Sequence, residues 1–173
     1  MKVIILEYRK TFTLKDGRSC TLRNGTERDG KAVLDNFILT HEQTDYLLTY
    51  PDESEITAEQ EALFLKSKAE SECEIELLAE VEGIVVGTAG INSMGKQYKV
   101  RHRADFGISI DKAYWGLGIG RALTQACIAC ARRAGYEQLE LNVAAENVCA
   151  IAMYEATGFV EFSRNPSGFK SHL

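Results

Sequence analysis

One stretch limits the possible folds of this chain more than any other. It runs from Asp105 to Ala134 and reads DFGISIDKAYWGLGIGRALTQACIACARRA. Alternating apolar residues predict a strand, a loop with three alternate glycines follows, and a 3.6-residue apolar period then predicts an amphipathic helix. Alternate glycines at the start of a helix expose successive backbone N–H groups, which suits the loop to hold phosphate groups. The stretch therefore predicts a strand–loop–helix unit that binds a nucleotide cofactor.

The rest of the sequence predicts a single mixed α/β domain that spans residues 1–173. Strand-like alternation surrounds helical periods, and a β-α-β unit lies in the second half. Good N-cap residues at Thr26 and Thr57 mark two helix starts. We expect strands at 3–8 and 11–15 (or one edge strand there), 19–23, 75–81, 84–91, 98–110, 137–144 and 159–163, and helices at 26–39, 57–71, 120–134 and 147–158.

Composition argues for a cytoplasmic protein. The chain is 45% hydrophobic and 26% charged, and no apolar run is long enough for a signal-peptide core or a membrane span. The formal charge of −5 argues against non-specific nucleic-acid binding. Five cysteines show no disulfide framework, and the pair Cys127 and Cys130 is predicted to be small core residues of a helix. No second cysteine pair completes a metal site, so we expect no metal.

The charge is unevenly distributed. Between Asp52 and Glu82 the chain carries eleven acidic residues against Lys66 and Lys68. The simpler interpretation is that these acids lie on the solvated faces of a helix and a strand. The alternative is a local negative potential that attracts a cationic amine.

The glycine loop alone does not identify the cofactor. A dinucleotide-binding loop has the spacing G-x-G-x-x-G directly after the first strand, whereas this loop reads G-x-G-x-G and lies two-thirds along the chain. Glu140 follows about 20 residues later, where such a fold places its ribose-binding acid. Because Glu140 is predicted to lie in the middle of a strand, a nicotinamide-dependent oxidoreductase is the weaker interpretation.

A second motif narrows the choice. Residues 141–159 read LNVAAENVCAIAMYEATGF, in which Asn147, Ile151 and Tyr154 fall on one stripe of a predicted helix. The amide and the phenol are then about 10 Å apart along the helix axis. Such a helix could line an elongated ligand and present a proton at one end. Each residue also has a structural interpretation, Asn147 as an N-cap and Tyr154 as a packed amphipathic side chain.

Taken together, the two stretches resemble the GCN5-related N-acetyltransferase (GNAT) superfamily over residues 106–159. The resemblance rests on the strand FGISID, the loop YWGLGIGRAL and the helix NVCAIAMYEATGF. It implies a three-layer α/β/α fold around a mostly antiparallel mixed sheet, splayed at the acetyl-CoA site between 104–110 and 139–144. Residues 1–97 would form the acceptor side and residues 98–163 the acetyl-CoA-binding half.

The resemblance also implies the roles of individual residues. The backbone of Ile108 and Ile110 would bond the pantetheine arm, Asn147 would hydrogen-bond that arm, and Tyr154 would protonate or hydrogen-bond the departing thiolate. Backbone N–H groups of the loop would bind the pyrophosphate; these belong to Gly116, Leu117, Gly118, Ile119, Gly120 and Arg121.

The implied function is an acetyl-CoA-dependent N-acetyltransferase with direct transfer to a primary amine of a small molecule or a peptide N-terminus. The alternative from another functional class is an acyl-CoA-binding regulatory module without turnover. The general base is left open among Glu80, Asp105, His102 and a water molecule. Cys149 is interpreted as a packing residue, since no histidine lies near it in sequence to activate it.

The sequence departs from the family pattern in two places. Trp115 stands where the phosphate loop usually begins with Arg or Gln, so a side-chain phosphate contact is lost while the backbone donors remain. After the strand expected at 159–163 and a turn at 165–168, only five residues (169–173) remain, where family members commonly add a further strand. That strand is then very short, the chain is truncated, or a partner completes the sheet edge, which leaves a homodimer open.

Overall fold

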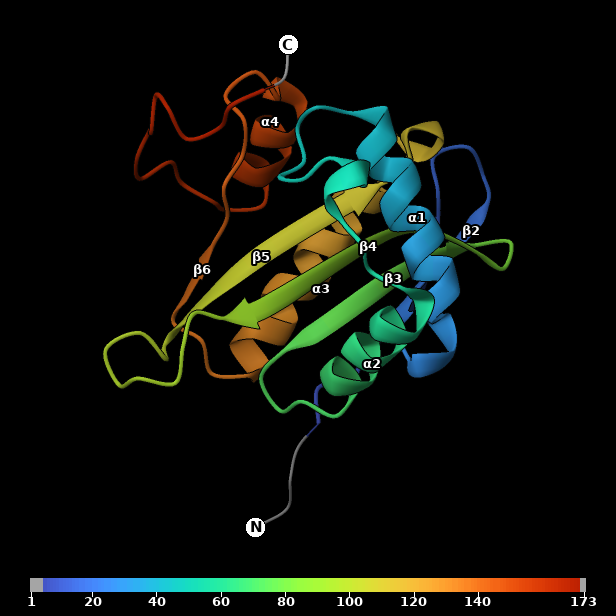
Figure 1. Ribbon diagram of the computed structural model, residues 1–173, viewed down its shortest axis with the longest axis horizontal. Coiled ribbons are helices and arrows are strands. Elements are labelled where there is room, and N and C mark those ends of the chain that lie inside the picture. Colours follow the sequence, from blue (N-terminus) through green and yellow to red (C-terminus); the bar gives the residue numbers. More distant parts are fainter. Residues whose placement is uncertain (1–4, 172–173) are drawn as a thin grey trace.

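The computed structural model describes residues 5–171 and contains one twisted sheet with helices on both faces (Figure 1). Six strands follow one another in chain order across the sheet, antiparallel except for the last pair. They are β1 (Arg9–Thr13), β2 (Ser19–Asn24), β3 (Ile75–Val81), β4 (Ile84–Ser93), β5 (Arg103–Ile110) and β6 (Gln138–Glu140).

Four α-helices cover this sheet. The first two lie on one face and the third on the other, as Figure 1 shows. We call these faces the α1/α2 face and the α3 face. The helices are α1 (Gly30–Gln43), α2 (Ala58–Ala69), α3 (Ile119–Arg133) and α4 (Val148–Ala156), with short 3-10 helices at Glu27–Asp29, Pro51–Glu53 and Lys112–Tyr114. The predicted mixed α/β fold with a mostly antiparallel sheet is confirmed.

The period-two pattern of the strands divides the core between the two faces. Ile75, Leu77 and Ala79 of β3 pack with α3 in the larger apolar cluster, which also contains buried Cys127 and Cys130. The intervening Leu78 packs with α1 and α2 in a second, smaller cluster. Alternation therefore places successive side chains in different cores. The C-x-x-C pair is part of the core, as predicted.

Local sequence signals set several boundaries. Thr57 accepts a hydrogen bond from the Gln60 backbone N–H at 3.2 Å and begins α2. Asp29 accepts from the Thr26 N–H at 2.8 Å, in a capping box that precedes α1. Glu82 and Gly83 both adopt positive φ angles, of 52° and 80°, as a tight β3–β4 hairpin turn requires.

Three predicted strand ranges are wrong in extent. Of the two N-terminal alternatives, the single edge strand is confirmed, but it covers only 9–13, and residues 3–4 lie outside the described residues. Residues 98–102 form a turn instead of the start of β5, since the N–H groups of Val100 and Arg101 bond locally to the Gln97 carbonyl. The strand predicted over 137–144 is confined to Gln138–Glu140, where β5 lies alongside it.

The strand predicted for residues 159–163 is not formed. Its alternating residues Val160 and Phe162 are 84% and 77% exposed. The chain here leaves the sheet, and no described strand lies alongside it to accept its backbone hydrogen bonds. A strand pattern without a neighbouring strand therefore stays irregular.

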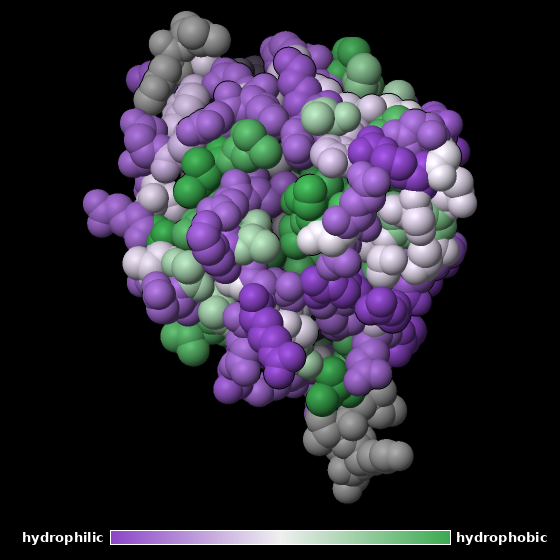
Figure 2. Space-filling model, turned by 90° about the vertical axis from the view of Figure 1, so that its right-hand side faces the viewer, coloured by the Kyte–Doolittle hydropathy of each residue, from purple (hydrophilic) through white to green (hydrophobic). Residues whose placement is uncertain are grey.

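The side of the molecule seen in Figure 2 is mostly hydrophilic, and its hydrophobic residues form separate small patches. Within residues 5–171, no helix combines the length and the apolar character that crossing a membrane requires. Seven of the eleven acids between Asp52 and Glu82 are exposed, while four are half-buried, namely Glu61, Glu74, Glu76 and Glu80.

Contact between α1 and α2 depends on the absence of a side chain at Gly30. A Cβ atom there would lie 2.6 Å from the Ala58 carbonyl oxygen and 2.8 Å from the Ala62 Cβ. We predict that Gly30→Ala lowers the free energy of unfolding by about 1–3 kcal/mol, because the helices must separate. Urea denaturation measures this change. The control Glu42→Ala, an exposed position of the same helix, should stay within about 0.5 kcal/mol, and an equally stable Gly30→Ala protein would contradict the packing argument.

Candidate functional site

The sheet splays open between β5 and β6. The two strands pair in parallel only where Arg103, Ala104 and Asp105 face residues 138–140. The guanidinium of Arg103 donates two hydrogen bonds to the Glu140 carboxylate, one of them from Nη2 at 2.8 Å. Beyond Asp105 the strands diverge, as Figure 1 shows, and β5 continues alone on that side. We call residues 106–110 of β5 the open edge.

Backbone groups of Ile108 and Ile110 point toward the space beside the open edge. The Asp111 N–H donates to the Val86 carbonyl of β4 at 2.9 Å. Since backbone groups along an antiparallel strand alternate in direction, those of Ile108 and Ile110 face away from β4. The Ile110 carbonyl is already used, because the Trp115 indole N–H donates to it at 2.8 Å. Trp115, for which the sequence predicted no specific contact, therefore joins the glycine loop to the end of β5.

The glycine loop has the geometry expected of an anion cradle. Gly116 and Gly118 have φ angles of 75° and 102°, which residues with a Cβ rarely adopt. The first bond inside α3 runs from the Ala122 N–H to the Gly118 carbonyl at 3.1 Å. The N–H groups of Ile119, Gly120 and Arg121 therefore have no acceptor within the helix. Together with the positive end of the helix dipole, they can bind a negative group.

Side chains around the loop hold it in place. Ile119 is 1% exposed and anchors the first turn of α3 in the core. A Cβ atom at Gly120 would lie 3.4 Å from the Ile110 side chain and 3.8 Å from Met153, so α3 approaches both β5 and α4 closely here. The Leu117 carbonyl accepts a hydrogen bond from the Lys15 N–H at 3.3 Å, which ties the loop to the β1–β2 hairpin.

The helix α4 places Tyr154 beside the open edge. The phenol ring packs edge-on against Phe106 of β5, with ring centroids 6.2 Å apart, and against Phe159 at 5.8 Å. Burial raises the pKa of Tyr154 to about 12. The hydroxyl forms no hydrogen bond with another described residue, so its proton is available to a ligand.

Asn147 caps α4, as its structural interpretation requires. Its side-chain Oδ1 accepts from the Ala150 N–H at 3.4 Å, while its Nδ2 donates to no described residue. The capping bond orients the amide without using its donor group. The structure thus allows the cap and the predicted ligand contact together.

The three candidate bases have different surroundings. Glu80 accepts from Arg23 at 2.9 Å in an ion pair shared with Asp29. His102 lies just before β5, where its carbonyl accepts from the Glu137 and Gln138 N–H groups. Asp105 is half-buried at the point where β6 leaves β5, and burial followed by the charge of Glu140 raises its pKa. Of the three, only Asp105 lies at the splay.

Glu140 does not have the environment of a ribose-binding acid. Its carboxylate is engaged by Arg103, whose hydrogen bonds keep the pKa of Glu140 below its usual value. Within the described part of the chain, no group of three or more His, Cys, Asp or Glu residues is arranged to hold a metal ion. Cys149 is exposed, rather than packed as its sequence interpretation had it.

The structure adds one candidate site residue that the sequence did not indicate. Glu76 of β3 lies on the α1/α2 face with its carboxyl across Gly90, where an added Cβ atom would overlap the Oε2 atom of Glu76. Burial, and then the charge of Glu61, raises the pKa of Glu76 to about 8, while Lys68 and a hydrogen bond with Thr88 oppose the shift. Beyond Gly90 in the same row is exposed Gly107 of β5, where an added Cβ atom would touch nothing. Gly90 makes room for the Glu76 carboxyl on the neighbouring strand, but the pairing of these two residues can be recognised only from the strand register.

Comparison with known proteins gives consistent results. Residues 36–159 match the model described as the acetyltransferase (GNAT) family. The chain is 43% identical over 56 residues to the [ribosomal protein bS18]-alanine N-acetyltransferase of Escherichia coli, a match that covers 32% of this chain and 38% of that protein. The chain spans less than half the length of the curated relatives that it matches first.

Solved structures share the fold. A GNAT-family acetyltransferase from Streptococcus pneumoniae superposes with a TM-score of 0.82 and 28% identity, over 88% of this chain and 92% of that one. A putative acetyltransferase from Salmonella typhimurium, solved with its cofactor acetyl-CoA, has a TM-score of 0.78 at 18% identity, over 88% of this chain and 86% of that one.

Burial of Glu76 predicts a pH-dependent stability. Because the pKa is near 8 in the folded state and near 4.5 in the unfolded state, the unfolded chain releases this proton first as pH rises. The contribution to stability is present below pH 4.5 and is lost between about pH 4.5 and 8. Each pKa unit corresponds to about 1.36 kcal/mol, so the loss reaches up to a few kcal/mol.

Glu76→Gln removes this titration, and we expect its free energy of unfolding to fall less between pH 5 and pH 8 than that of the wild type. Urea denaturation of both proteins at the two pH values measures the difference. The control Glu72→Gln, at an exposed position, should follow the wild type. Parallel pH profiles for Glu76→Gln and the wild type would show that Glu76 titrates normally.

Proposed function

The chain belongs to the acetyltransferase (GNAT) family, and from this premise we propose that it transfers an acetyl group from acetyl-CoA directly to a primary amine. The observation that carries the proposal is the conjunction of three features at the open edge of β5. These are the free backbone groups of that edge, the uncapped N–H groups of α3 and the unbonded Tyr154 hydroxyl. The edge suits the pantetheine arm of an acyl-CoA, the N–H groups suit its pyrophosphate, and the hydroxyl suits its sulfur.

The cofactor is proposed to lie along this edge. Its pyrophosphate accepts hydrogen bonds from the N–H groups of residues 116–121, and its pantetheine arm bonds the backbone of Ile108 and Ile110. Because the Ile110 carbonyl already accepts from Trp115, Ile110 contributes its N–H group. The Nδ2 of Asn147 supplies a further donor to the arm.

Tyr154 is proposed as the hydrogen-bond donor and general acid for the leaving thiolate. A pKa of about 12 keeps the phenol protonated at neutral pH. A thiol has a pKa near 8.5, so complete proton transfer from the free-state phenol is unfavourable. Donation of a hydrogen bond to the developing negative charge requires no complete transfer and still lowers the barrier.

The acceptor is proposed to be a small-molecule amine or a peptide N-terminus. The Escherichia coli relative is named for acetylation of a ribosomal-protein alanine, which supports the second class. Seven of the eleven acids between Asp52 and Glu82 are exposed, and their negative potential favours an acceptor that carries positive charge. Thiol release from acetyl-CoA across a panel of diamines and peptides tests both classes.

A regulatory module that binds acyl-CoA without turnover is the competing function. Binding of acetyl-CoA without thiol release on every amine would favour it. The unbonded Tyr154 hydroxyl beside the open edge supports catalysis, because binding alone needs no proton donor there.

We predict that Tyr154→Phe lowers kcat by about 10- to 100-fold, because the leaving thiolate loses its hydrogen bond. The dissociation constant of acetyl-CoA should change by less than about threefold, since the phenyl ring keeps the packing on Phe106. Steady-state kinetics and calorimetry measure the two effects. The control Tyr98→Phe, a 79% exposed position, should behave as wild type, and an unchanged kcat for Tyr154→Phe would remove Tyr154 from the mechanism.

We predict that Gly118→Ala weakens acetyl-CoA binding by at least about tenfold, because a methyl group enters the space above the N–H groups of α3. The φ angle of 102° adds backbone strain to the substitution. Gly83→Ala carries similar strain at φ 80°, in the β3–β4 turn, and serves as the matched control. Equal acetyl-CoA affinity in the two folded variants would contradict the proposal that the glycine loop binds the pyrophosphate.

A further inference from the structure

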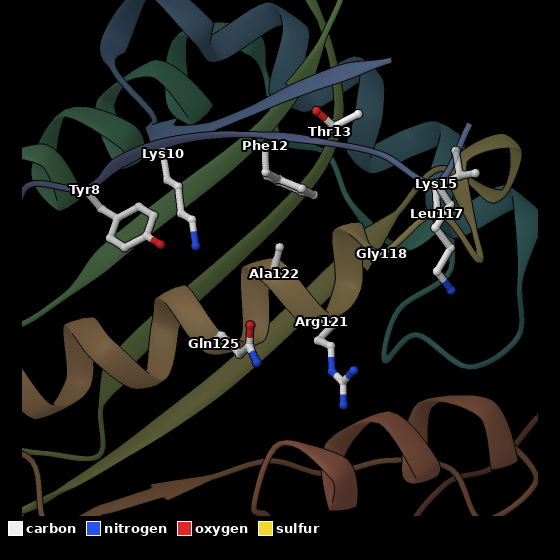
Figure 3. A pocket seen from close by; sticks show the side chains of 10 residues that line it. All are labelled: Tyr8, Lys10, Phe12, Thr13, Lys15, Leu117, Gly118, Arg121, Ala122 and Gln125. Atoms are coloured by element: carbon white, nitrogen blue, oxygen red, sulfur yellow. The ribbon is translucent and has the colours of Figure 1, made fainter. Parts of the chain in front are cut away.

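The cavity on the α3 face does not suit a cationic acceptor. Lys10 and Lys15 point from the β1 side toward the space in front of α3, and Arg121 extends from α3 itself (Figure 3). No acidic residue lines this cavity, so an ammonium group is repelled there. The other face of the sheet, covered by α1 and α2, carries the Glu76 carboxyl.

Two glycines form an open row beside Glu76 on the α1/α2 face. Glu76, Gly90 and Gly107 are paired in this order across β3, β4 and β5. The Glu76 Oε2 atom occupies the place that a Gly90 side chain would take, whereas a Cβ atom added at Gly107 would have no atom within 4 Å. Gly107 is exposed in the middle of β5, where α1 and α2 do not cover the strand (Figure 1). The row therefore leaves room for a small group above Gly107, next to the Glu76 carboxyl.

This room adjoins the open edge of β5. Gly107 lies between Phe106, on which Tyr154 packs, and Ile108, whose backbone faces the proposed pantetheine arm. A thioester between that arm and the Tyr154 hydroxyl therefore lies beside Gly107. Directly paired Cα atoms of an antiparallel ladder are about 4.5–5.5 Å apart. A nitrogen atom above Gly107 is then within reach of the Glu76 carboxyl, directly or through one water molecule.

We propose that Glu76 is the general base of the transfer reaction and takes a proton from an acceptor ammonium group bound above Gly107. The inference rests on the proposed function and adds the acceptor side to it. The Glu76 carboxylate removes one proton from the ammonium group. The free amine attacks the thioester carbonyl carbon, a C–N bond forms, and the C–S bond breaks with its electron pair on sulfur. A second proton of the nitrogen passes to the thiolate, and Glu76 returns its own proton to water.

The surroundings of Glu76 suit a proton acceptor. Within residues 5–171 its carboxyl is in no ion pair, and the nearby Lys68 ammonium is engaged by Glu74, to which it donates at 2.6 Å. Burial and then the charge of Glu61 raise the pKa of Glu76 to about 8, against the opposing charge of Lys68. A base whose pKa is close to the working pH keeps an ionised fraction and still accepts a proton readily. An ammonium group bound beside it favours the ionised form.

The proposed acid and base lie on opposite faces of the sheet. Tyr154 and Phe106 pack in the apolar cluster on the α3 face, whereas Glu76 lies on the α1/α2 face. A thioester at the open edge lies between them. The amine can therefore approach the carbonyl from one face while the sulfur leaves toward the hydroxyl on the other.

The test measures thiol release from acetyl-CoA with butylamine, putrescine and alanine amide as acceptors. For the amines that the wild type acetylates, we expect Glu76→Gln to lower kcat/KM at pH 7 by at least about 100-fold. The dissociation constant of acetyl-CoA, measured by calorimetry, should change by less than about threefold, because the glycine loop and the open edge hold the donor. The control Glu137→Gln makes the same change at an exposed position and should behave as wild type.

Gly107→Ala tests the acceptor's place independently of the carboxyl. The added methyl group meets no atom within 4 Å, so the variant should fold and keep its affinity for acetyl-CoA. Because the methyl group occupies the room above β5, kcat/KM for the amine should fall by at least about tenfold. An unchanged kcat/KM would overturn the placement of the acceptor above Gly107.

The pH profile separates a catalytic role of Glu76 from a structural one. With butylamine or putrescine, which titrate at higher pH, wild-type kcat/KM should rise up to about pH 8 and then level off, because an ionised base and a protonated amine react together. Glu76→Gln should lack this break and continue to rise, since its reaction needs an amine that is already neutral. A lower rate with the break retained, or an equal loss of acetyl-CoA affinity, would indicate a structural role and overturn the inference.

A Glu76→Gln protein with the wild-type kcat/KM and pH profile would overturn the inference and leave the proposed function intact. So would a break that Asp105→Asn removes and Glu76→Gln keeps, since Asp105 is the neighbouring acid on the same face of β5. A wild type that binds acetyl-CoA and releases no thiol with any of the three amines would overturn the proposed function and this inference together.

Discussion

The short pairing of β5 with β6 is the constraint on which the candidate site depends. Arg103 and Glu140 join the two strands where their side chains meet across the parallel ladder. The pairing ends at Asp105 and Glu140, and the strand and the following chain then diverge. Had the ladder continued to Ile110, the backbone groups of the open edge would be consumed within the sheet. An incomplete sheet is thus what leaves hydrogen-bonding groups for a ligand.

The divergence of the strands is maintained by packing on both sides of the gap. Phe106, Tyr154 and Phe159 form an aromatic group between β5 and α4. Gly120 lets α3 approach both β5 and Met153 of α4, so the helix start lies beside the same gap. Trp115 adds a hydrogen bond from the loop to the Ile110 carbonyl. These contacts fix the N–H groups at the start of α3 and the aromatic group of α4 in position relative to the open edge of β5.

The two faces of the sheet carry charges of opposite sign, which suit the donor and the acceptor of the proposed reaction. The α3 face and β1 carry the cations Lys10, Lys15 and Arg121 around the start of α3. The segment from Asp52 to Glu82, which includes α2 and β3, carries seven exposed acids, whereas burial keeps the Glu76 carboxyl mainly protonated at neutral pH. A polyanionic donor and a cationic acceptor would therefore approach from regions of opposite potential. In the proposed reaction the two would meet at the splay, so that the sheet would separate the two binding sites and join the reacting groups.

The sequence by itself determined the elements with strong local signals. Glycines with positive φ, threonine caps and the period-two pattern of 75–81 depend on near neighbours, and the structure confirms each of them. The motifs at 105–134 and 141–159 likewise predicted the family. Only the tertiary structure decided where β5 and β6 part, that residues 159–163 find no partner strand, and that Glu76 lies across Gly90 and Lys10 faces α3. These features arise from pairing and packing between segments far apart in the chain, which no local pattern specifies.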